Sequence, residues 1–147
     1  MIAAWLLGLF LAVITIAFHY EAILGVIRWV PHLCSHFRCR VVIAVFCLLV
    51  AHVAEIWLFA GGHYAAVEWF SLGELKGEFS GAIREYVYFS VITYTTVGYG
   101  DITPTGEVRI IAGLESLTGL IMIAWSAAFT AFFLQRQWEK EVPPEQD

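Results

Sequence analysis

The sequence has few charged residues for its length. Of its 147 residues, 14% are charged and 60% are hydrophobic. A soluble domain of this size would leave large apolar patches on its surface, so the composition predicts a membrane protein. Lysine and arginine number 8 against 13 acidic residues, and the net charge is −5. Because no basic stripe is available to neutralise phosphates, the composition excludes nucleic acid as a partner.

Cysteine is also scarce. Cys34, Cys39 and Cys47 are an odd number without a secreted disulfide pattern, and we expect reduced cytoplasmic thiols. Cys34 and Cys39 alternate with His32 and His36 in one short block. Zinc sites usually combine two separate pairs of ligands, so this block does not favour a metal site.

Long apolar runs make up most of the chain. Residues 1–18, 41–60 and 110–134 are each long enough to cross the roughly 30 Å core of a bilayer as a helix. The first run lacks the basic leading region and the small-residue cleavage site of a signal peptide, so we expect it to be retained. The sequence therefore predicts an all-α membrane protein with three transmembrane helices in a lipid bilayer.

The polar stretches between the runs predict the orientation. Residues 19–40 and the tail at 135–147 carry five basic residues, whereas residues 61–109 carry three. This excess places the linker and the C-terminus in the cytoplasm and the N-terminus outside a cell membrane. Apolar residues recur at helical spacing in the linker before Pro31, which predicts an amphipathic helix on the inner membrane surface.

A shorter segment lies between the second and third runs. Residues 83–94 follow Ser80, a candidate cap, and have Glu85 in the first turn, which favours a helix start. Twelve residues reach only about 18 Å, too short to span, so we expect a re-entrant helix. Irregular backbone at membrane depth is tolerated only inside protein or against water. The residues that follow, up to Asp101, should therefore line a cavity or pore.

Those residues are TVGYG, residues 96–100. Backbone carbonyls can replace the water around a dehydrated cation if successive ones point inward, and Gly98 and Gly100 can adopt the positive φ that this requires. The segment resembles the selectivity filter of tetrameric potassium channels, for which TVGYG is the known example. The resemblance covers residues 41–134 as a pore domain, and residues 1–18 and 19–40 lie outside it.

The resemblance implies a homotetramer that carries passive potassium flux without a cofactor and without enzymatic activity. The K⁺ ions would bind to the carbonyls of Thr96, Val97, Gly98 and Tyr99 and to the Thr96 hydroxyl, with Gly100 completing the filter. The support expected around the filter consists of Tyr88, Phe89 and Tyr94 as an aromatic cuff, and of Asp101 accepting a hydrogen bond from Tyr88. Ile92 stands where the family often carries a carboxylate or an aliphatic residue, so bracing of the filter through an acid there is absent.

The third run contains candidate cavity and gate residues. Gly119 lies where family members often carry a hinge glycine, and close helix packing explains it equally well. Ile123, Ala127 and Ala131 share one helical face and would line the cavity, and Gln135 would mark the cytoplasmic mouth.

Three ionisable residues, His52, Glu55 and Glu115, lie inside predicted spans, where such residues usually pair or function. Their depths allow a contact between His52 and Glu115 behind the filter. We favour a static hydrogen-bonded anchor there over a proton-sensitive brace.

Other functions remain open at this stage. The same fold would suit a weakly selective cation channel or a non-conducting subunit. A membrane enzyme with a metal at His52 and Glu55 lacks a third ligand at suitable spacing. No helix has a basic residue at every third position, so a voltage sensor of the usual kind is missing and the gating stimulus is not predicted.

Overall fold

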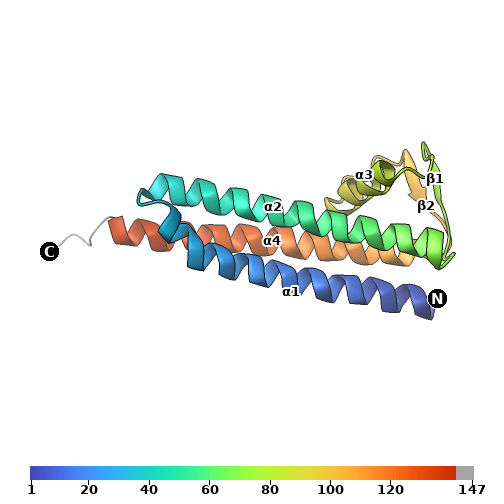
Figure 1. Cartoon of the computed structure of the whole chain (residues 1–147), viewed down its shortest axis with the longest axis horizontal. Coiled ribbons are helices and arrows are strands. Elements are labelled where there is room, and N and C mark those ends of the chain that lie inside the picture. Colours follow the sequence, from blue (N-terminus) through green and yellow to red (C-terminus); the bar gives the residue numbers. More distant parts are fainter. Residues whose placement is uncertain (142–147) are drawn as a thin grey trace.

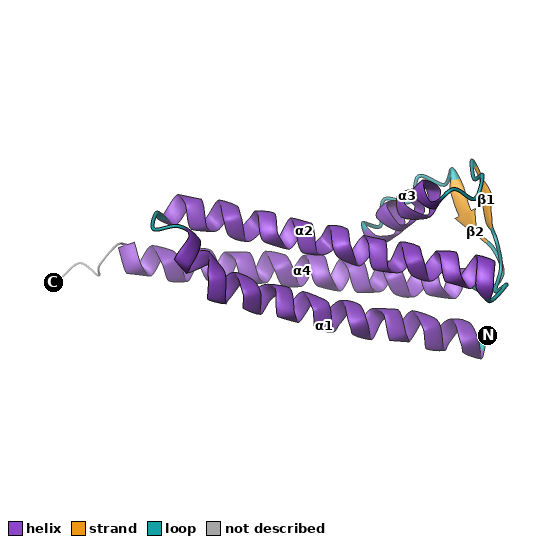
Figure 2. Ribbon diagram, in the orientation of Figure 1, coloured by secondary structure: helices purple, strands orange, loops and turns teal. Residues whose placement is uncertain are grey.

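The chain forms three long helices that run side by side, with a short helix at one end (Figure 1). The computed structural model describes residues 1–141, with side chains to residue 136. The four helices are α1 (Ile2–Leu33), α2 (Phe37–Tyr64), α3 (Ile83–Tyr94) and α4 (Val108–Glu141); a π-helical turn, η1 (Ala65–Trp69), and two strands, β1 (Leu75–Gly77) and β2 (Ile102–Pro104), complete the fold (Figure 2).

The prediction of an all-α membrane fold with three spans is confirmed. The helical segments Ile2–Leu33, Phe37–Trp69 and Val108–Arg136 are each long and apolar enough to cross a membrane. Many of their large apolar side chains are exposed, including Phe10, Phe46 and Leu120. Lipid is the natural solvent for such faces.

The first helix is longer than predicted. We expected it to end at Phe18 and a separate surface helix to follow in residues 19–40, and both boundaries are wrong because α1 continues to Leu33. Its buried residues recur every three or four positions and form one stripe that faces the bundle: Ala4, Gly8, Leu11, Thr15, His19, Ile23, Val26 and Val30. The helix continues past Phe18 because polar His19 is fully buried among partners from other helices.

The later boundaries also differ from prediction. The chain reverses within residues 34–36, so α2 begins at Phe37 rather than at residue 41, and η1 prolongs it to Trp69. At the other end, α4 runs on to Glu141, into the segment 135–147 expected as a short tail. Residues 142–147 of that tail lie outside the described part of the chain.

Helix α3 has the predicted bounds of 83–94 but a different start. Its N-cap is Ala82, which supplies no side-chain cap, so the expectation of Ser80 as the cap is wrong. Instead the Ser80 backbone N–H and hydroxyl both donate to the Glu85 carboxylate, at 2.5 and 2.8 Å. These hydrogen bonds, the one from the Ser80 N–H above all, lower the pKa of Glu85. The carboxylate therefore orders the chain that enters the helix.

A two-stranded sheet closes the re-entrant segment, and the sequence did not predict it. Strands β1 and β2 pair antiparallel, with Leu75 opposite Pro104 and Gly77 opposite Ile102. The Glu78 N–H also donates to the Asp101 carbonyl at 3.0 Å. The sheet thus ties the chain before α3 to the chain after the candidate filter. Figure 1 places this sheet and the N-terminus at one end of the bundle and the last described turn of α4 at the other.

Candidate functional site

The segment between α3 and β2 has an unusual backbone. Thr96, Gly98 and Gly100 have φ values of +60°, +52° and +85°, and they alternate with Val97 and Tyr99, which do not have positive φ. The prediction of positive φ at both glycines is confirmed. Threonine rarely adopts this region, and a residue held there costs about 1–3 kcal/mol, which is typical of functional sites.

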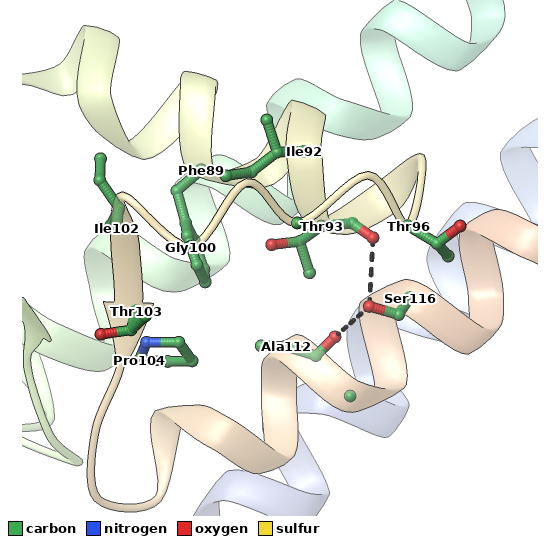
Figure 3. A pocket seen from close by; sticks show the side chains of 12 residues that line it. Phe89, Ile92, Thr93, Thr96, Gly100, Ile102, Thr103, Pro104, Ala112 and Ser116 are labelled. Carbon is green, nitrogen blue, oxygen red and sulfur yellow. Dashed lines mark hydrogen bonds between the residues drawn. The ribbon is translucent and has the colours of Figure 1, made fainter.

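Hydrogen bonds hold this segment against the end of α3. The Thr96 N–H donates to the Thr93 carbonyl and the Gly98 N–H donates to the Ile92 carbonyl, both at 3.0 Å. The Ser116 hydroxyl on α4 lies 3.1 Å from the carbonyl oxygens of Thr93 and Ala112 (Figure 3). The segment is thus held directly by the end of α3, and that end is in turn held by Ser116 of α4.

A groove of about 390 Å³ lies between this segment, α3 and α4, and its lining residues converge in Figure 3. The lining comprises Phe89, Ile92, Thr93, Thr96, Gly98, Gly100, Ile102, Thr103, Pro104, Ala112, Gly113 and Ser116. The groove is open on its outer side, so the single chain leaves the segment uncovered.

The expected aromatic cuff is not formed inside one chain. Val97 and Tyr99 are 52% and 74% exposed. Tyr94 is fully buried and directs its hydroxyl to Glu55, while Phe89 packs edge-on against the His63 ring at 5.0 Å. Both side chains are drawn toward α2 because it offers apolar surface and polar partners. The cuff around the filter of an assembled channel therefore stays a prediction for Tyr88, Phe89 and Tyr94.

The predicted contact between Tyr88 and Asp101 is present. The Tyr88 hydroxyl donates to Asp101 Oδ2 at 2.6 Å. This hydrogen bond lowers the pKa of Asp101 and raises the pKa of Tyr88 to about 12. The carboxylate's contribution to stability is lost as pH falls through its lowered pKa, and the phenol's is lost as pH rises through about 12. The bond therefore persists across the neutral range.

We expect Tyr88→Phe to move the pKa of Asp101 upward, toward its ordinary value, because the largest cause of its lowering is removed. Carbon-13 NMR titration of aspartate carboxyl groups measures the change. Tyr86→Phe is the matched control, since the Tyr86 hydroxyl donates to Glu68 instead. An Asp101 pKa equal in wild type and Tyr88→Phe would contradict this role of the bond.

The predicted contact between His52 and Glu115 is wrong, because each residue belongs to a different polar cluster. His52 Nδ1 lies 3.1 Å from Glu55 Oε2 and 3.0 Å from the Tyr94 hydroxyl, and its Nε2 lies 3.0 Å from Ser126 Oγ. Glu115 Oε2 lies 2.6 Å from His63 Nε2. The pH-sensing hypothesis for a His52–Glu115 pair therefore no longer stands.

Two histidines missed in the sequence complete these clusters. His19 Nδ1 lies 2.8 Å from Glu55 Oε1, and its Nε2 lies 3.2 Å from Ser126 Oγ. Glu115 is shared by His63 and by Ser90, whose hydroxyl also donates to the Ile56 carbonyl at 2.8 Å. His19 follows Thr15 by four residues, a spacing that places both side chains on one face of a helix. This spacing could have predicted a buried His19, but the helix was expected to end at residue 18.

His19 also supplies the third ligand-type side chain near His52 and Glu55 that we expected to be missing. Within the described residues, these three form the one group of histidine, cysteine or acidic side chains with converging ligand atoms. The block around His32 and His36 forms no such group there. The structure pairs Cys34 with Cys39, with Cα atoms 6.2 Å apart, so the expectation of reduced thiols is wrong for these two.

The candidate cavity residues lie on α4. Gly119 is buried, and a Cβ placed on it would lie 2.1 Å from the Tyr94 carbonyl oxygen. This close approach favours the packing interpretation over the hinge. Ile123, Ala127 and Gln135 are exposed in the single chain, as is Ala131. Ala127 and Ala131 also line a groove of about 520 Å³ between α2 and α4.

Known proteins resemble part of this chain. The family described as "Ion channel" matches residues 41–136. The potassium voltage-gated channel protein shk-1 of Caenorhabditis elegans is 35% identical over 54% of this chain and 14% of its own length. Protein LctB of Geobacillus stearothermophilus is 36% identical over 53% of this chain and 57% of its own. The two pore potassium channel a of Oryza sativa subsp. japonica is 29% identical over 62% of this chain and 26% of its own.

The chain thus spans between about a seventh and just over half of the length of these relatives. No solved structure matches it. The family match covers well over half of the chain and includes most of α2, all of α3, the segment 95–101 and most of α4. The chain therefore belongs to the ion channel family.

Proposed function

We propose that this chain is a subunit of a homotetrameric potassium-selective channel that carries passive K⁺ flux across a cell membrane. The ions would be held by the backbone oxygens of Thr96, Val97, Gly98 and Tyr99 from four copies, and by the Thr96 hydroxyl. The observation that carries the proposal is the alternation of positive φ at residues 96, 98 and 100 in the uncovered segment after α3. Such alternation aligns successive peptide groups, which lets their dipoles act on one ion.

Helix α3 contributes to the electrostatics of this site. It ends at Tyr94, directly before the segment, with Thr95 as its C-cap. The C-terminal end of a helix carries a partial negative charge, which favours a cation beside it. Asp101, with its carboxylate held ionised by Tyr88, would add negative charge at the outer mouth and concentrate cations there.

A homotetramer is proposed because one chain supplies one wall of the filter. Val97 and Tyr99 are large side chains left exposed beside an open groove, and neighbouring copies around an axis would cover them. In such an assembly the exposed face of Ile123, Ala127, Ala131 and Gln135 would line the cavity below the filter. The positive-inside rule favours a cytoplasmic C-terminus and an external N-terminus. Passive conduction requires no cofactor.

Purified protein in liposomes tests the proposal. With a potassium gradient, we expect a flux that is at least about a hundredfold larger for K⁺ than for Na⁺ and that barium blocks, because the carbonyl spacing suits potassium. Native mass spectrometry of the same sample should give four copies per assembly. Equal K⁺ and Na⁺ flux would support the weakly selective alternative. A tetramer without flux would support the non-conducting subunit.

A further inference from the structure

We propose that His19, His52 and Glu55 form a binding site for a divalent transition metal ion, for which zinc is the best chemical match. This inference concerns a site apart from the filter and goes beyond potassium conduction. The ligand atoms of the three side chains all lie within 4.8 Å of one another. Imidazole nitrogen and carboxylate oxygen are ligands that zinc accepts together.

The geometry brings one nitrogen from each histidine to the same carboxylate. His19 Nδ1 lies 2.8 Å from Glu55 Oε1, and His52 Nδ1 lies 3.1 Å from Glu55 Oε2. Ligand atoms around a tetrahedral zinc are about 3.3 Å apart when the bonds are about 2.0 Å. Both histidine–carboxylate distances are close to this value, so these two pairs need little movement to admit an ion.

Tyr94 offers a fourth ligand. Its hydroxyl oxygen lies 3.0 Å from His52 Nδ1 and donates a hydrogen bond to Glu55 Oε2. Four protein ligands make a closed site, which is typical of structural rather than catalytic zinc. The Glu55 carboxylate and a Tyr94 phenolate would balance the two positive charges of the ion, with the phenol proton released to solvent.

The hydrogen bonds of Ser126 favour a bound metal ion over a cluster held by hydrogen bonds alone. Its Oγ lies 3.0 Å from His52 Nε2 and 3.2 Å from His19 Nε2. Without a metal, the arrangement that lets both rings donate to the Glu55 carboxylate has a proton on each Nδ1 atom. Both Nε2 atoms of two neutral rings would then be acceptors, and the single Ser126 proton can serve only one of them.

A bound metal ion removes this shortage of hydrogen-bond donors at Ser126. With the ion on both Nδ1 atoms, both Nε2 atoms carry a proton, and Ser126 Oγ accepts both hydrogen bonds with its two lone pairs. Metal-bound histidines typically donate the other ring N–H to such a partner. Without a metal, the cluster needs either one extra proton, held as an imidazolium on His19 or His52, or a Tyr94 hydroxyl whose hydrogen is shared between Glu55 Oε2 and His52 Nδ1.

The site is buried but reachable. The His19 and Glu55 side chains are 0% exposed, and the His52 side chain is 16% exposed. His52 and Ser126 line the groove of about 520 Å³ between α2 and α4, which gives an ion a route to the ligands. Once bound, the ion would join α1, through His19, to α2 and to the last residue of α3, directly before the filter.

Metal analysis of the full-length protein tests the site. After removal of metal by a chelator and reconstitution with zinc, inductively coupled plasma mass spectrometry should find about one zinc ion per subunit. Replacement of zinc by cobalt should give the visible absorption bands of tetrahedral Co²⁺. His19→Ala should lower the zinc content at least about tenfold. His63→Ala, which alters the other buried histidine–carboxylate pair, should leave the zinc content unchanged.

Ser126→Ala covers the case in which His19→Ala fails to fold. It keeps all the ligands but removes the partner of both Nε2 atoms, so we expect zinc affinity to fall about 10- to 100-fold. The proposal is overturned if the folded wild-type protein retains less than about a tenth of an equivalent of zinc and shows no cobalt bands. It is also overturned if the folded His19→Ala or Ser126→Ala variant binds zinc as tightly as wild type.

Discussion

Gly119→Ala is expected to destabilise the subunit strongly. The new Cβ would lie 2.1 Å from the Tyr94 carbonyl oxygen and 2.9 Å from the carbonyl carbon, so backbone rather than a flexible side chain must move. Overpacking of this kind costs about 1–3 kcal/mol of the free energy of unfolding, and we expect the upper end of that range. A thermal unfolding midpoint lowered by about 5–10 °C, followed by tryptophan fluorescence in detergent, would show it.

Gly61→Ala is the matched control for that experiment. Gly61 also lies inside a long helix, α2, but a Cβ there meets no atom within 4 Å. Alanine is the better helix former by about 1 kcal/mol, so the control should unfold at or slightly above the wild-type temperature. If the Gly119→Ala variant has the same unfolding midpoint as the wild type yet loses potassium flux, Gly119 acts as a hinge and the packing interpretation fails.

Gly98→Ala is expected to remove most of the potassium flux. Gly98 has φ +52°, and an L-residue in this region costs about 1–2 kcal/mol. Four copies in a tetramer would together disfavour the conducting backbone by at least about 4 kcal/mol, which corresponds to roughly a thousandfold. The liposome flux assay measures the loss.

Two controls separate backbone strain from general damage to the channel. Gly25→Ala places the same methyl group on α1, where no atom lies within 4 Å, and should conduct as wild type. D-alanine at position 98, introduced by chemical ligation, prefers positive φ and should restore flux. Full flux in Gly98→Ala would show that the positive φ of this residue is not required for conduction.

The local elements were largely predictable because each depends on short-range chemistry. Residues 83–94 form a helix with the predicted bounds, since a first-turn acid and the glycines beyond residue 94 delimit it. The positive φ of Gly98 and Gly100 followed from the need for a backbone that glycine permits. The Tyr88–Asp101 hydrogen bond was expected from the resemblance of this segment to potassium channel filters, and it is present.

The partners of buried polar groups were not predictable in the same way. His52 contacts His19 and Ser126, which are respectively 33 residues before it and 74 residues after it, and no local pattern encodes such pairings. The length of α1 depends on the same contacts, because His19 is tolerated in an apolar helix only where other helices supply partners. Strands β1 and β2 are each three residues long, too short to leave a period-two pattern.

The sequence by itself determined the membrane setting, the number of spans and the segment of residues 96–100 that we propose as the filter. These features depend on composition, on run length against the thickness of a bilayer, and on the backbone freedom of particular residues. The tertiary structure decided which ionisable groups meet: Glu55 with two histidines and a tyrosine, and Glu115 with His63 and Ser90. The physical reason is that a buried charge has no preference for a partner by sequence distance, and the crossing of helices alone brings its partners within reach.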